Sequence, residues 1–147
     1  MLLNRTADGR QIANPEKFPS GFKPVADYIH SLGLKSGLYT AKGPTTCAGF
    51  AASCNHEVQD AAQWAEWGID YVKECVPEPA RCARPRKRLT PLPLHRSDSC
   101  STCAGFTDDQ IYARMWGAIQ ASGRPMVLTV EGDPDDATIT RGGYGYA

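Results

Sequence analysis

Three stretches of the chain carry apolar residues at helical spacing, and a glycine and a strand-like run follow each of them. A repeat of three to four residues places apolar side chains on one face of a helix. This repeat predicts helices over residues 20–32, 55–65 and 107–119, which end at Gly33, Gly68 and Gly123. The strands are expected over residues 34–39, 69–73 and 125–131.

The predicted helix faces define the expected core. Their residues are Phe22, Val25, Ala26, Ile29 and Leu32, then Val58, Ala61, Ala62 and Ala65, then Ile111, Met115, Ala118 and Ile119. The third helix has the clearest beginning, because Thr107 and Gln110 form a capping-box pair flanked by a possible hydrophobic staple of Phe106 and Ile111. The third strand is apolar enough to be buried on both faces. Three such units predict an α/β fold with parallel strands and helical crossovers.

One segment, residues 75–97, differs from its surroundings. It holds six basic residues against one acid, a net charge of +5, whereas the whole 147-residue chain has 16 basic and 16 acidic residues and no net charge. It also separates Gly68 from Gly123 by 55 residues, against 35 between Gly33 and Gly68. Without its 23 residues the longer spacing would be 32. The segment is therefore either an insertion, such as translated intron, or a long functional loop of the kind that such folds carry.

Composition excludes several classes of protein. The length fits one ordinary domain, and 41% hydrophobic with 22% charged residues is typical of a globular chain. No apolar run approaches the roughly 20 residues that span a bilayer, and the start of the chain is too short for a secretory signal. A neutral chain has no overall basic footprint for nucleic acid. The basic run over residues 81–88 could bind nucleic acid, although a solvated loop explains it more simply.

With residues 75–97 removed, the strand over residues 68–74 continues directly into Asp98-Ser99-Cys100. This string resembles the nucleophile strand of glycoside hydrolase family 27, which comprises α-galactosidases and α-N-acetylgalactosaminidases. Further stretches are similar to the same family in the same order, namely residues 8–21, residues 30–39, Thr46-Cys47-Ala48-Gly49-Phe50 and residues 60–68.

The resemblance implies a partial (β/α)8 TIM barrel of about three βα units, with its site at the carboxyl ends of the parallel strands. It implies that Asp98 is the catalytic nucleophile, that Lys73 and Glu131 bind sugar hydroxyls and that Tyr39 is an aromatic residue of the binding site. The implied reaction is the retaining hydrolysis of a terminal α-linked galactose, in which two carboxyl groups lie about 5–5.5 Å apart. The implied partner is an α-galactoside, with no nucleic acid, membrane, metal or organic cofactor. Members of the family are often homodimers.

A whole barrel of this type needs roughly 250 residues. The strand that carries the acid/base aspartate in the family has no counterpart here. Residues 1–147 are therefore expected to be a fragment of a catalytic domain, interrupted at 75–97 and inactive by itself. The alternative is a non-catalytic carbohydrate-binding or interaction remnant.

Six cysteines indicate either an oxidising compartment or a metal site. The resemblance implies a disulfide between Cys47 and Cys100 beside the substrate, and a secreted or lysosomal/vacuolar location. Cys54 and Cys103 could form a second bridge. The zinc alternative combines Cys100 and Cys103 with Cys75, Cys82 or His95, but a lone CxxC is weak evidence. The three histidines are expected to be structural or solvated.

One further motif is independent of the resemblance. Asn4-Arg5-Thr6 is a sequon for N-glycosylation, a tripeptide that often occurs by chance.

Overall fold

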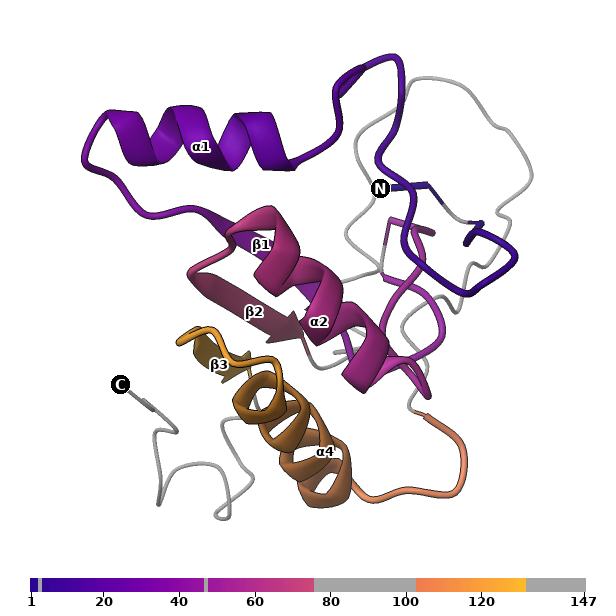
Figure 1. Ribbon diagram of the computed structural model, residues 1–147. Coiled ribbons are helices and arrows are strands. Elements are labelled where there is room, and N and C mark those ends of the chain that lie inside the picture. Colours follow the sequence, from indigo (N-terminus) through magenta and orange to yellow (C-terminus); the bar gives the residue numbers. More distant parts are fainter. Residues whose placement is uncertain (3, 47, 76–102, 132–147) are drawn as a thin grey trace, which may run out of the picture.

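Three parallel strands form the centre of the molecule (Figure 1). The computed structural model describes residues 1–2, 4–46, 48–75 and 103–131. The strands β1 (Gly37–Ala41), β2 (Tyr71–Cys75) and β3 (Val127–Glu131) pair in the order β1-β2-β3, and both pairings are parallel. The prediction of a parallel sheet with helical crossovers is confirmed. Within these residues no helix has the length and apolar character needed to cross a membrane.

The helices are α1 (Lys23–Ser31), α2 (Glu57–Trp67) and α4 (Asp108–Ala121). Helices α2 and α4 lie side by side over one face of the sheet, whereas α1 lies at the far end beside α2 (Figure 1). Gly68 ends α2 in the left-handed conformation, with φ of +79°, and Thr107 and Gln110 form the predicted capping box of α4. The local signals for helix ends are therefore confirmed.

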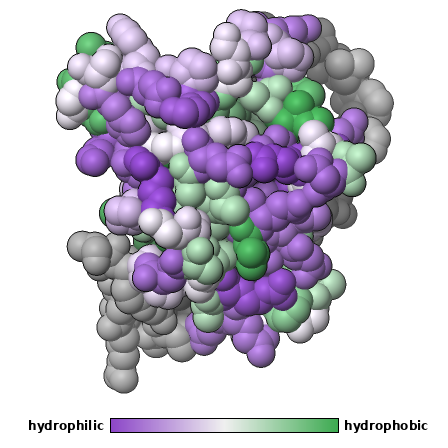
Figure 2. Space-filling model, in the orientation of Figure 1, coloured by the Kyte–Doolittle hydropathy of each residue, from purple (hydrophilic) through white to green (hydrophobic). Residues whose placement is uncertain are grey.

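The core lies between these two helices and the sheet. It consists of Ala61, Trp64, Ile69, Val72, Met115, Ala118, Ile119, Met126 and Leu128. The predicted apolar face of α4 is confirmed, because its four expected residues are all buried. The surface in Figure 2 is mixed, with hydrophobic patches among hydrophilic ones.

Two predictions of burial are wrong. The third strand is not buried on both faces: Leu128 is buried, whereas Val127 is 37% exposed. The reason is that the described helices cover only one face of the sheet. On α1 only Ala26 is buried, and Val25 and Leu32 are exposed, because α1 packs against α2 at the edge of the sheet rather than over the strands. The strands also begin two to three residues later than expected.

The buried side of α2 is both apolar and polar, because Ala61 and Trp64 lie in the core while Asp60 is buried beside them. Val58 is 69% exposed and Ala62 is exposed, so the predicted face holds only in part. Asp60 is fully buried instead and receives two hydrogen bonds from the Arg5 guanidinium, at 2.6 and 2.8 Å. Gln11 adds a third bond to Asp60 at 3.0 Å. A fully paired ionic network therefore attaches the N-terminal segment to this helix.

Asp70 joins the amino ends of the strands. Its carboxylate accepts hydrogen bonds from the Ser36 backbone N–H at 2.9 Å and from Arg124 at 2.8 Å, and it lies 2.6 Å from the His30 ring. Burial opposes its ionisation, but these partners outweigh that effect and lower the pKa of Asp70 to about 2. The contact with Asp70 supports the structural interpretation of His30.

The Arg5–Asp60 pair predicts a large effect of a single truncation. Arg5→Ala leaves a buried carboxylate without its cation, which typically costs about 3–5 kcal/mol. We expect the opening free energy of the α2 amides, measured by native-state hydrogen exchange, to fall by that order. The matched control is Lys23→Ala, which removes the exposed pair of Lys23 with Asp27 and should cost about 0.5 kcal/mol or less. Equal effects of the two variants would contradict the assigned role of Arg5.

Candidate active site

Two predicted site residues lie next to each other on the face of the sheet opposite α2 and α4. Tyr39 of β1 pairs in register with Lys73 of β2, which pairs in turn with Thr129 of β3. Cross-strand partners point to the same face, and successive residues alternate between faces. Since Val72 and Leu128 are buried under the helices, Tyr39, Lys73 and Thr129 share the other face.

This face is accessible and carries polar groups along the strands. Tyr39 is 39% exposed and Lys73 is partly buried. The Tyr71 hydroxyl lies 2.6 Å from the Thr129 hydroxyl on the same face. A phenol and an ammonium group at neighbouring positions can both donate hydrogen bonds to sugar hydroxyls. Such an arrangement can orient a sugar ring without a metal.

The remaining predicted residues are placed only in part. Glu131 is the last residue of β3 and pairs with Cys75, two residues beyond Lys73 along β2. Cys47, Asp98 and Cys100 lie outside the described residues. The structure therefore brings together the strand positions of Tyr39, Lys73 and Glu131, and the position of the predicted nucleophile stays a prediction.

On the helix-covered side, Glu74 is a buried carboxyl group that the sequence analysis did not single out. Its side chain has no exposed area, and neither carboxyl oxygen has a hydrogen-bond partner among the described residues. Burial, reinforced by the charge of Glu57 and opposed by Lys42, raises the pKa of Glu74 to about 8. Glu74 therefore holds its proton at neutral pH.

Two ion pairs surround Glu74. Lys42, which follows β1 and is 2% exposed, forms an ion pair with Asp108 in the first turn of α4. Glu57 of α2, also buried, accepts a hydrogen bond from Arg114 of α4 at 3.0 Å. The first pair connects α4 to the loop after β1, and the second connects α4 to α2. The charges next to Glu74 are thus already engaged with partners of their own.

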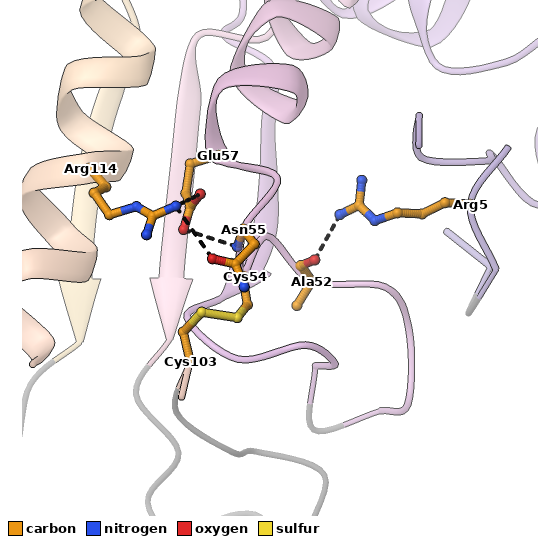
Figure 3. The surroundings of a disulfide bond; sticks show 7 residues. All are labelled: Arg5, Ala52, Cys54, Asn55, Glu57, Cys103 and Arg114. Carbon is orange, nitrogen blue, oxygen red and sulfur yellow. Dashed lines mark hydrogen bonds and ion pairs between the residues drawn. A yellow bond between two sulfur atoms is a disulfide. The ribbon is translucent and has the colours of Figure 1, made fainter. Parts of the chain in front are cut away.

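A disulfide reinforces the same connection (Figure 3). Cys54 and Cys103 are bonded, with their Cα atoms 5.4 Å apart. The second bridge that the sequence left open is therefore present. In Figure 3 the bridge lies beside Arg114, whose guanidinium contacts Glu57 and also lies 4.2 Å from the centre of the Phe106 ring.

The disulfide overturns the zinc alternative in the form that used Cys103. Its sulfur is bonded to Cys54 and is not available as a thiolate ligand. In the parts of the chain that the structure describes, no group of three or more His, Cys, Asp or Glu side chains could hold a metal ion.

Sequence reasoning missed Glu74, Lys42 and Glu57 because their burial depends on packing between segments. One signal was available for Glu74. It alternates with Val72 along β2, so it lies on the face that the helices cover. A carboxyl group on the covered face of a strand could therefore have been noted from the alternation alone.

Comparisons with known proteins agree with this fold. A family model described as alpha galactosidase A matches residues 1–82. The curated alpha-galactosidase A of Cellvibrio japonicus is 39% identical over 126 residues, which is 86% of this chain and 25% of that protein.

Two solved structures extend the likeness. The α-galactosidase of Saccharomyces cerevisiae solved with raffinose superposes on 97% of this chain and 27% of its own, with a TM-score of 0.73 and 27% identity. The α-galactosidase I of Mortierella vinacea superposes on 86% of this chain and 27% of its own, with a TM-score of 0.65 and 34% identity.

Parallel strands, covering helices and these neighbours define part of a (β/α)8 glycoside hydrolase barrel. The chain belongs to the alpha galactosidase A family. It spans about a quarter of the length of the relatives described above.

Glu74 predicts a dependence of stability on pH. Its folded pKa of about 8 exceeds the ordinary value of 4.5, so the folded chain keeps a proton that the unfolded chain releases. The contribution of Glu74 to the free energy of unfolding should be highest below pH 4.5 and should fall by about 1.4 kcal/mol per unit as the pH rises towards 8. Glu74→Gln should remove this contribution, as measured by urea unfolding at pH 5 and pH 8 with tryptophan fluorescence.

The control for this experiment is Glu16→Gln, which changes an exposed carboxyl group. The three histidines are common to all three proteins and cancel in the comparison. An unchanged dependence of stability on pH in Glu74→Gln would contradict the assignment to this residue.

The cysteine pairing makes a separate prediction. Proteolysis of the oxidised chain without reductant should yield a peptide pair linked through Cys54 and Cys103, identified by mass spectrometry. The bridge between Cys47 and Cys100 implied by the family resemblance should appear in the same digest. A linkage of Cys103 to Cys100 would contradict both assignments.

Proposed function

We propose that the chain contributes part of the sugar site of a retaining α-galactosidase. The observation that supports this most directly is the pairing of Tyr39 with Lys73 on the uncovered face, midway along the strands, with Glu131 at the carboxyl end of β3. In a (β/α)8 enzyme the site is built at the carboxyl ends of the strands. Membership of the alpha galactosidase A family supports galactose as the sugar.

Each residue has a distinct role in this proposal. Asp98 attacks the anomeric carbon and forms the glycosyl-enzyme, while the leaving-group oxygen is protonated by a carboxylic acid from another strand of the barrel. Lys73 and Tyr39 donate hydrogen bonds to the sugar hydroxyls, and Glu131 accepts one. Water then attacks the anomeric carbon and releases the sugar with its configuration retained.

The same proposal makes this chain incomplete as an enzyme. The chain aligns with only 25% of the curated alpha-galactosidase A of Cellvibrio japonicus. The 147 residues alone are therefore expected to show no turnover. If they bind galactose without hydrolysing it, the alternative of a non-catalytic carbohydrate-binding remnant is favoured.

We further propose that residues 1–147 are a piece of the catalytic domain and that residues 75–97 interrupt it. The net charge and the spacing of the units support this. The disulfide supports it as well. Cys103 is bonded to Cys54, just before α2, whatever the length of the segment that precedes Cys103. Removal of these residues would place Asp98 directly after Glu74.

A chimera tests the site and the interruption together. The matching segment of the Cellvibrio japonicus enzyme is replaced by residues 1–74 joined to residues 98–131. Hydrolysis of a nitrophenyl α-galactoside should be retained by this chimera and lost when residues 75–97 are restored. Lys73→Ala in the active chimera should lower kcat by about 100-fold, because a hydrogen bond to the reacting sugar is lost.

The matched control is Lys23→Ala, since Lys23 is an exposed lysine of α1, which does not lie over the strands. Its chimera should keep its activity. Asp98→Asn should abolish turnover while the chimera still folds. Full activity of the Asp98→Asn chimera would refute the assignment of the nucleophile.

A further inference from the structure

The sequon at Asn4 is a motif that the sugar site does not use. The sequence contains three asparagines, and only Asn4 is followed two positions later by a hydroxyl residue, Thr6. Asn14 precedes a proline, and Asn55 has Glu57 at the corresponding position. Any N-linked glycan on this chain would therefore lie on Asn4.

The fold leaves the acceptor side chain accessible. Asn4 and Thr6 are exposed, whereas Arg5 between them turns inward to Asp60 and to the Ala52 carbonyl, at 2.7 Å from the latter (Figure 3). None of the side-chain hydrogen bonds that hold the N-terminal segment involves the side chain of Asn4. A bulky glycan at this position would displace none of the contacts that hold the N-terminal segment to α2.

The hydroxyl of the sequon is occupied in the folded chain. Thr6 Oγ1 accepts a hydrogen bond from the Arg10 backbone N–H at 2.8 Å and closes a turn. A transferase that needs this hydroxyl must therefore act before the turn forms, as on a chain that is still entering a secretory compartment.

The disulfide gives independent evidence for such a compartment. Cys54–Cys103 requires oxidising conditions to persist, and compartments that maintain them are also where N-glycans are added to secreted proteins. The bridge and the sequon lie on different parts of the chain, so their evidence is independent.

We propose that Asn4 carries an N-linked oligosaccharide. In the transfer, the Asn4 side-chain nitrogen bonds to the anomeric carbon of a sugar activated as a lipid pyrophosphate. The bond from that carbon to the pyrophosphate oxygen breaks, the lipid pyrophosphate leaves with the electron pair, and the amide nitrogen loses one proton. The modification does not depend on the proposed hydrolase activity.

The test is expression of the full chain behind a cleavable secretion signal in a eukaryotic host. The secreted chain should migrate as a glycosylated species that an N-glycan amidase returns to its unmodified mobility. Mass spectrometry should find aspartate at position 4 after this treatment. Asn4→Gln and Thr6→Ala should abolish the modification, whereas Thr6→Ser, which keeps the hydroxyl, should retain it.

A reporter variant keeps the result decisive. Gln120→Asn creates an Asn-Ala-Ser sequon at the exposed end of α4, and it is combined with Asn4→Gln. A glycan on this reporter, together with a formed Cys54–Cys103 bridge, shows that the chain reached the glycosylating compartment. An unmodified Asn4 in wild-type chains from the same host would then overturn the proposal.

Discussion

The alignment of the three strands depends on the carboxylate of Asp70. It lies just before β2 and receives hydrogen bonds from the residue preceding β1 and from Arg124, which precedes β3. Because its ionised form is stabilised by these partners, its pKa stays at about 2 and the contacts persist at neutral pH. Parallel strands fixed at their amino ends keep the same register at their carboxyl ends. Tyr39 and Lys73 lie level, midway along their strands, for this reason.

The parts of the fold that could be predicted from the sequence are those set by local chemistry. Gly68 adopts a left-handed conformation that most side chains disfavour, and Thr107 caps α4 through its own side chain. Both helix ends can therefore be recognised from a few neighbouring residues of the sequence. The buried polar residues of α2 cannot be recognised in this way. Asp60 is buried because Arg5, 55 residues away, neutralises it, and hydrophobic periodicity contains no information on such a partner.

The same distinction applies to the candidate site. Tyr39 and Lys73 were inferred from family motifs, which encode positions on strands, and the register makes the two residues neighbours. Cys54–Cys103 could be named from the sequence only as one of several pairings, since spacing does not determine which cysteines meet. In the sequence, Glu74 stands out only as the residue before the interruption at residues 75–97. Its burial arises from the packing of α2 and α4 over β2, which no local pattern encodes.

The two faces of the sheet therefore differ, because the described residues cover one face and leave the other exposed. On the helix side the core is closed, and the charges around Glu74 are paired across α2 and α4. On the other face Tyr39, Tyr71 and Val127 each keep more than a third of their surface exposed. In a barrel that face is covered by side chains from the other strands. The proposed sugar-binding residues lie on the face that needs those strands, so the chemistry of this segment depends on a larger barrel.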